Sequence, residues 1–273
     1  MRLNFQNKIH YILRLAVAMC FIGHGIFGII TKAVWCNYFG VFAIGRELSF
    51  QLMPLVGFID IVLGIIMLVY PVRAIPAWLI FWGILTAVLR PLSGEPFAEF
   101  IERSGNFGAP LALLLLSGIP TNGRGWFRRI DPFIMPDPTT TANVATCLKL
   151  VVFLLLFGHG LLNVIGKESI LNQYRSLGSS SPEELALITG LAEITAAFFV
   201  LFKPFRPLLL VMFFWKMGSE MLYPHYALFE WIERGGSYGA LLALWVITKG
   251  YSIPGFVPSR EYTLLGNAGD FKT

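Results

Sequence analysis

The sequence predicts an all-α, polytopic membrane protein whose eight transmembrane helices form two parallel-repeat four-helix bundles. The first observation is composition: of 273 residues, 56% are hydrophobic and only 14% are charged, and the mean hydropathy is +0.67. A water-soluble domain of ordinary composition is far less apolar. The second observation is that the chain resembles itself at offsets of 131 to 135 residues, which indicates an internal duplication.

The composition also excludes several other classes of protein. A chain this apolar is neither intrinsically disordered nor a disulfide-stapled secreted domain. Its formal net charge of +5 comes from scattered Lys and Arg residues, so no nucleic acid partner is expected. The three cysteines, Cys20, Cys36 and Cys147, are odd in number and contain no C-x-x-C spacing, so we expect neither a disulfide framework nor a metal site.

Continuous apolar stretches predict the transmembrane helices. A bilayer core of about 30 Å requires roughly 20 mostly apolar residues per helix. X-Pro steps at Pro71, Pro76, Pro204 and Pro207 mark two of the turns between helices. The first stretch is too long for a signal peptide and lacks a small-x-small cleavage pattern, so it is expected to remain as a helix. The eight predicted spans are 9–30, 51–70, 74–90, 105–120, 144–166, 185–202, 206–222 and 236–250.

Charge distribution predicts the orientation of these spans. An even number of spans places both termini on one side of the membrane, and most of the 21 Lys and Arg residues fall on that side. By the positive-inside rule both termini are cytoplasmic, in the inner membrane of a bacterial or archaeal cell. The segments expected outside are 31–50, 91–104, 167–184 and 223–235.

The duplication defines the expected domains. Gly23-His24-Gly25 recurs as Gly158-His159-Gly160, and the acidic Asp60 recurs as Glu193. The strongest match joins residues 99–109 to 230–240, where seven of eleven positions are identical. We therefore expect two four-helix membrane repeats and two cytoplasmic segments: 1–120 as the first repeat, 121–143 as a linker, 144–250 as the second repeat and 251–273 as a tail.

These motifs resemble the DoxX/DoxD family of four-helix membrane proteins, here in tandem. The resemblance rests on the Gly-His-Gly centre of the first helix followed by Lys32, on the acidic residue of the second helix, and on the polar approach to a glycine-rich fourth helix. It covers about residues 10–120 and 145–250. The resemblance implies a redox-associated function, because the best-known member class is the membrane subunit of a thiosulfate:quinone oxidoreductase.

His24, Asp60, His159 and Glu193 are the candidate catalytic residues. A carboxylate in the middle of a span is costly unless it faces the helix bundle, and a nearby histidine can exchange protons near neutral pH. Each histidine and acid pair would suit quinone chemistry, in which protons accompany electrons. The structural alternative is a hydrogen bond that fixes neighbouring helices. A less favoured alternative is one haem b held by His24 and His159, which needs ring-sized space that no sequence pattern shows.

A second group of charged residues is a candidate for substrate or anion contact. Arg103 and Arg234 precede the fourth and eighth spans and could anchor an anion, or they could serve a structural role. Lys216 and Glu220 replace Gly83 and Ala87 of the first repeat and have the spacing of an ion pair on one helix. Because the second repeat has more polar residues, we expect it to carry the active site. The full set is Arg103, Arg234, Glu102, Glu233, Lys216 and Glu220.

Two functions of different classes remain open from the sequence. The first is a redox-associated membrane protein that interacts with quinone, with or without catalysis of its own. The alternative is a non-catalytic subunit or scaffold that holds a membrane or periplasmic protein partner within the lipid bilayer. A transporter ranks third because no matched pair of broken helices is evident. We interpret Trp35, Trp78, Trp126 and Trp231 as an aromatic belt at the membrane interface.

Overall fold

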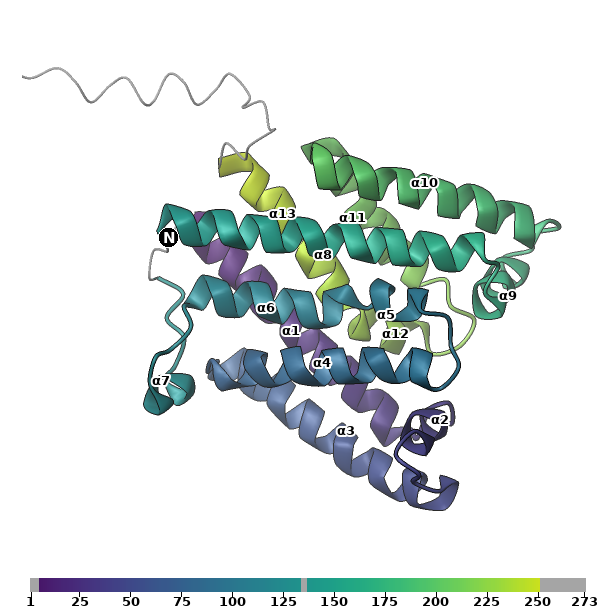
Figure 1. Ribbon diagram of the computed structural model, residues 1–273, viewed down its shortest axis with the longest axis horizontal. Helices are drawn as coiled ribbons and strands as arrows, with labels where there is room; N and C mark the ends of the chain where they lie inside the picture. Colours follow the sequence, from purple (N-terminus) through teal and green to yellow (C-terminus); the bar gives the residue numbers. More distant parts are fainter. Residues whose placement is uncertain (1–4, 134–136, 251–273) are drawn as a thin grey trace, which may run out of the picture.

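The computed structural model describes residues 5–133 and 137–250, and this part of the chain is all-α (Figure 1). The predicted tail at 251–273 lies outside the described residues. The longer helices are α1 (Phe5–Ile29), α3 (Arg46–Val69), α4 (Ala74–Leu92), α6 (Ser104–Ser117), α8 (Pro138–Val164), α10 (Pro182–Phe202), α11 (Arg206–Glu220) and α13 (Gly235–Gly250). The shorter helices are α2 (Trp35–Gly40), α5 (Ala98–Glu102), α7 (Gly123–Phe127), α9 (Glu168–Ser176) and α12 (Ala227–Glu233).

Five helices are long and apolar enough to cross a membrane, which suggests a multi-pass membrane protein. They are α1, α3, α4, α8 and α10. Many of their outward side chains are large and apolar, including Phe58, Phe81 and Phe199, each more than half exposed in the isolated chain. Such surfaces are expected where a helix contacts lipid.

The prediction of eight spans is shown only in part, because three of the helices that occupy predicted spans are short. Helices α6, α11 and α13 occupy the predicted fourth, seventh and eighth spans, but they contain 14, 15 and 16 residues. At 1.5 Å per residue they are about 21 to 24 Å long, which is less than the thickness of a bilayer core. The predicted fourth and seventh spans, 105–120 and 206–222, run two or three residues past the ends of α6 and α11, whereas the predicted eighth span, 236–250, matches α13 within one residue.

Two helix breaks occur where the sequence analysis expected none. Helices α5 and α6 meet at Arg103, and α12 and α13 meet at Arg234, with φ of −82° at both residues and ψ of 12° and 9°. The expectation that matched broken helices are absent is therefore wrong. The hydropathy pattern predicts loops for the charged segments before these arginines. In the structure these segments form the short helices α5 and α12.

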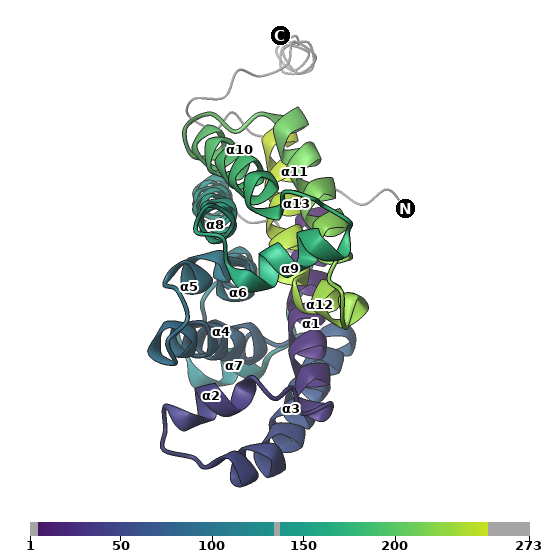
Figure 2. The same ribbon diagram turned by 90° about the vertical axis from the view of Figure 1, so that its right-hand side faces the viewer.

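The packing of the long helices links the two halves of the chain. Helix α1 packs against α3 from its own half and against α12 and α13 from the other. Helix α8 packs against α10 from its own half and against α5 and α6 from the other. Figure 2 shows α8 beside α10 in one part of the molecule and α2 between α3 and α4 in another. The division into domains stays a prediction.

Glycines allow the closest helix contacts. A Cβ atom added to Gly25 of α1 would lie 2.5 Å from the carbonyl oxygen of Gly57 in α3, and one added to Gly160 of α8 would lie 2.7 Å from that of Gly190 in α10. Side chains larger than hydrogen would hold these backbones apart. The same crossings bring the candidate histidines of α1 and α8 close to the acids of α3 and α10.

Candidate functional site

The half-buried His24 pairs with the buried Asp60 between α1 and α3. Their atoms Nδ1 and Oδ2 are 2.7 Å apart, and Asp60 is only 2% exposed. The indole Nε1 of Trp82 in α4 donates a hydrogen bond to the same carboxylate oxygen at 3.3 Å. The expected burial of this acid, and its pairing with the histidine of its own half, are confirmed.

A second cluster has the same composition in α8, α10 and α11. His159 Nδ1 lies 2.5 Å from Glu193 Oε2, and Trp215 Nε1 donates to Glu193 Oε1 at 2.7 Å. Glu193 is 2% exposed. This pairing is confirmed as well. Trp82 and Trp215 complete the two clusters. They had no role in the sequence analysis, although their recurrence at an offset of 133 residues is a signal that identifies them.

The chemistry of each pair follows from the ring nitrogen that the acid engages. With Nδ1 directed at a carboxylate, the neutral imidazole donates its proton there and keeps Nε2 as an acceptor. The carboxylate stabilises the imidazolium that forms when Nε2 takes up a proton. Each pair can therefore accept and release one proton through Nε2.

Trp35 does not belong to the aromatic belt at the membrane interface that the sequence analysis expected. Its side chain is buried, and its ring is stacked on the imidazole of His24 with centroids 4.5 Å apart and planes inclined by 30°. Helix α2, which carries Trp35, packs against α3 and α4 where a loop was expected. Sequence position near a span end does not distinguish a lipid-facing indole from one that turns inward.

The Glu-Arg segments of α5 and α12 pair across the two halves. Arg103 Nη1 lies 3.4 Å from Glu233 Oε1, and Arg234 forms an ion pair with Glu102. All four side chains are buried. Each Glu-Arg segment thus finds its ion-pair partner in the other half of the chain. Since both guanidinium groups already contact carboxylates, neither offers an unpaired positive charge to an anion.

A cavity of about 360 Å³ lies around these crossed pairs and is called the central cavity. Its wall includes ion pairs of Lys167 with Glu95 and Glu99, and of Lys32 with Glu230. His159 also lines it. The wall carries five basic and five acidic side chains: Lys32, Arg90, Arg103, Lys167, Arg234, Glu95, Glu99, Glu102, Glu230 and Glu233.

Glu95, in the loop between α4 and α5, illustrates how the wall holds its charges. Burial alone would raise the pKa of this carboxyl, but the neighbouring Arg90 guanidinium and the hydrogen bond from the Tyr38 hydroxyl hold its pKa below the usual range. The carboxylate is thus ionised at neutral pH and keeps Arg90, 3.4 Å away, in place. The same contacts tie α2 to the end of α4.

Lys216 and Glu220 form the ion pair that the sequence predicts on α11. Lys216 Nζ lies 2.9 Å from Glu220 Oε1, and the two residues are 0% and 1% exposed. Glu220 Oε2 also lies 3.9 Å from Arg234 Nε. The pair is therefore part of the buried network and does not stand free in a binding pocket.

No protein-family model, curated protein or solved structure matches this chain. The site must be interpreted from its own geometry. Among residues 5–133 and 137–250, no three His, Cys, Asp or Glu side chains gather as metal ligands.

The geometry does not fit one haem held by both histidines. His24 and His159 line different cavities, and the ring of His24 is covered on one face by Trp35. A bis-histidine haem needs both imidazoles to point at one shared, ring-sized space. The two histidines therefore lie at separate cavities.

Proposed function

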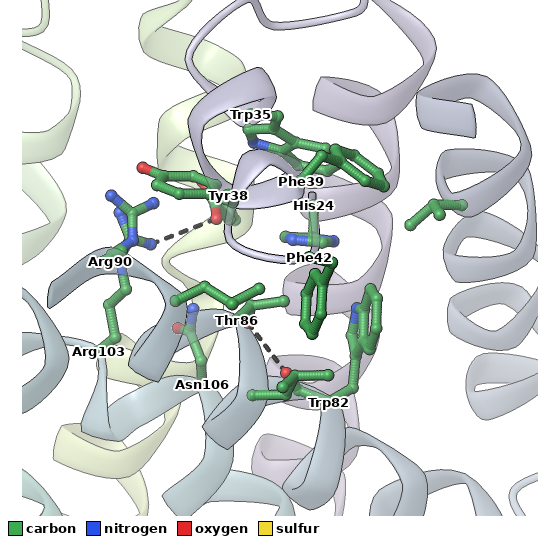
Figure 3. A pocket seen from close by; sticks show the side chains of 14 residues that line it. His24, Trp35, Tyr38, Phe39, Phe42, Trp82, Thr86, Arg90, Arg103 and Asn106 are labelled. Carbon is green, nitrogen blue, oxygen red and sulfur yellow. Dashed lines mark hydrogen bonds and ion pairs between the residues drawn. The ribbon is translucent and has the colours of Figure 1, made fainter. Parts of the chain in front are cut away.

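We propose that this chain is a redox-associated integral membrane protein that binds quinone and exchanges protons with it through a His-carboxylate pair. The observation that carries the proposal is the placement of His24, which contacts Asp60 through Nδ1 and lines an aromatic cavity (Figure 3). A buried pair beside such a cavity has the elements of general acid-base catalysis at a flat, apolar ligand. The resemblance to DoxX/DoxD proteins favours the same function.

The proposed topology has eight membrane crossings in two parallel repeats, with both termini in the cytoplasm. Helices α5 and α6 together form the fourth crossing, and α12 and α13 form the eighth, each broken at an arginine. The matching breaks, the matching His-acid-Trp clusters and the exchanged packing of α1 and α8 support this arrangement. The excess of Lys and Arg on the terminus side supports a cytoplasmic location for the termini in a bacterial or archaeal inner membrane.

Reduction of a quinone to a quinol takes up two electrons and two protons. A reduced sulfur compound or a protein partner supplies the two electrons. The imidazolium supplies one proton to a quinone oxygen through Nε2, and water supplies the second proton and the proton that recharges the imidazole. The adjacent carboxylate stabilises the charged ring before transfer, and the Trp indole N–H holds that carboxylate in position.

Quinone turnover and binding by purified protein test the proposal. We expect His24→Ala, or Asp60→Asn, to lower quinone turnover by about 10²- to 10⁴-fold, the usual contribution of a general acid-base group. Arg175→Gln is a suitable control, because Arg175 is exposed and its ion pairs are with the exposed side chains of Glu168 and Glu183. Unchanged turnover in the pair variants of both halves would remove the pairs from the mechanism. Absence of quinone binding, together with a stoichiometric cofactor-bearing partner, would favour the scaffold function.

The matched helix breaks favour transport of a small solute as a second candidate function. Transporters use paired broken helices around a central polar site. Here the breaks at Arg103 and Arg234 border the central cavity, whose charges are balanced. Proteoliposomes loaded with a pH-sensitive dye would detect coupled proton movement when zwitterionic amino acids are added outside. No proton movement with a broad amino acid mixture would argue against this candidate.

A further inference from the structure

The segment 119–133, which follows α6, is anchored to the turn between α3 and α4. Arg129 forms an antiparallel bridge with Val72, and the backbone nitrogen of Ile130 donates a hydrogen bond to the carbonyl oxygen of Pro71 at 2.8 Å. Ile130 is 1% exposed and joins the core. The short helix α7 of this segment lies near the start of α4 (Figure 1). This part of the predicted linker thus has a defined place beside the ends of two candidate membrane spans, α3 and α4.

Two arginines of the helix bundle reach the same end and are held by helix carbonyl groups. Arg14 of α1 donates from Nε to the carbonyl oxygen of Met67, near the end of α3, at 2.8 Å. Arg73 donates from Nη2 to the carbonyl oxygen of Ser117, at the end of α6, at 2.7 Å. Positive side chains at the C-terminal end of a helix complement the helix dipole. Nε of Arg73 is also used in this way, whereas its Nη1 makes no hydrogen bond with a described residue.

The segment 119–133 adds further guanidinium groups without adding acids to pair with them. The antiparallel bridge makes Arg128 a neighbour of Arg73, and burial together with the positive charge of Arg128 lowers the pKa of Arg73. Arg129 lies over the ring of Tyr70, 5.6 Å from its centroid. Across the described ranges 5–133 and 137–250, the ion pairs with carboxylates include none from Arg14, Arg73, Arg124, Arg128 or Arg129.

The opposite end of α4 shows how differently charge is balanced elsewhere. Around the central cavity each basic side chain has a carboxylate partner: Lys32, Arg90, Arg103, Lys167 and Arg234. Asp131, the acid within 119–133, instead accepts a hydrogen bond from the backbone nitrogen of Phe133. Because like charges that face each other are destabilising, the arginines at the start of α4 need an anion from outside the chain.

Exposed apolar side chains lie among these arginines. Phe127 of α7 is 72% exposed and stands between Arg124 and Arg128 in the sequence, and Ile119 and Tyr70 are more than half exposed. Positive and large apolar side chains together, at the end of a membrane-spanning helix, are typical of surfaces that lie in the headgroup region of a bilayer. The surface therefore suits an anion that also has an apolar part.

We propose that this basic surface, formed by Arg73, Arg124, Phe127, Arg128 and Arg129, binds the phosphate headgroup of an anionic phospholipid. Guanidinium groups hold phosphate oxygens through charge-assisted hydrogen bonds that can be bidentate. A phospholipid fits better than a free anion, because the exposed apolar side chains would contact its acyl chains. None of these five residues lines the central cavity or the aromatic cavity beside His24, so the site is independent of the proposed quinone function.

Retention of phosphatidylglycerol by the full-length protein in a neutral detergent, measured by native mass spectrometry, tests the proposal. Phosphatidylcholine with the same acyl chains is the zwitterionic reference, and we expect phosphatidylglycerol to be retained preferentially. The double variant Arg128→Gln, Arg129→Gln should weaken its binding about 30-fold, since one basic residue at a membrane surface contributes a factor of about five. Higher ionic strength should weaken the binding as well.

Arg46→Gln is the matched control for the double variant. Arg46 is exposed and also lies over an aromatic ring, that of Phe50, at 5.3 Å. It begins α3, whereas Tyr70 follows the other end of the same helix. The control should leave the affinity for phosphatidylglycerol unchanged. Thermal unfolding without added lipid establishes that both variants are folded.

Photolabelling of the unmodified protein provides a second measurement that does not depend on a variant that folds. Phosphatidylglycerol with a photoactivatable headgroup should label peptides from 119–133 and not peptides from 31–50. Equal retention of the two lipids, label elsewhere, or an equal loss in Arg46→Gln would overturn the site. Displacement of the lipid by millimolar inorganic phosphate would indicate a free-anion site and overturn the choice of lipid. Quinone turnover is measured separately, in phosphatidylcholine nanodiscs, so that each proposal can fail without the other.

Discussion

Replacing Arg234 with methionine is expected to destabilise the folded protein by about 3 to 5 kcal/mol, the range found when one partner of a buried ion pair is removed. Arg234 pairs with Glu102, which is 1% exposed, and it also lies near Glu220. Methionine retains much of the side-chain volume but leaves the Glu102 carboxylate buried without its cation. Thermal unfolding in a mild detergent, followed by circular dichroism, measures the loss.

A double variant separates the charge effect from packing. Glu102→Leu combined with Arg234→Met removes both charges, and we expect it to recover most of the lost stability, because buried ion pairs contribute little beyond a well-packed apolar pair. Arg175→Met removes an exposed arginine from its pair with Glu168 and should change stability little. Equal loss in the single and double variants would show that the loss comes from packing and not from an unpaired Glu102 carboxylate.

Helix positions could be predicted from the sequence because they depend on local features. Continuous apolar runs and the X-Pro steps near Pro71 and Pro204 define where α3, α4, α10 and α11 begin or end, and the structure agrees within a few residues. The pairing of His24 with Asp60 was predictable for a similar reason. A carboxylate in the middle of an apolar helix must turn away from lipid and towards a polar partner. The histidine in the first span of the same half is such a partner.

The features that were missed depend on contacts between distant parts of the chain. Nothing in the local pattern shows that α1 packs on α12 and α13, or that the chain bends at Arg103 while remaining helical on both sides. The inward turn of Trp35 depends on the path of α2. The larger number of polar residues in the second half can be counted in the sequence. Only the structure shows that Lys216 and Glu220 form a buried ion pair with each other.

Gly23→Ala is expected to destabilise the protein by about 3 kcal/mol, the upper part of the usual range for overpacking a tight core. A Cβ atom at Gly23 of α1 would lie 2.2 Å from the backbone nitrogen of Glu233 and 2.4 Å from its Cα. These are backbone atoms of α12, so no side chain can rotate away. The helices must separate, and the movement would pull Glu233 from Arg103. Thermal unfolding and the fraction of protein recovered as monodisperse particles report the effect.

Gly218→Ala is the matched control for this prediction, because it also replaces a helical glycine with alanine. Gly218 lies in α11, is exposed, and has no atom within 4 Å of an added Cβ. Alanine is favoured over glycine inside a helix by roughly 0.5 to 1 kcal/mol, so this variant should be as stable as the original chain or slightly more so. Opposite signs for the two substitutions identify close approach of α1 and α12 as the cause. If Gly23→Ala is tolerated as well as Gly218→Ala, the two helices are not in backbone contact, and the exchanged packing of the two halves, together with the crossed ion pairs that depend on it, is incorrect.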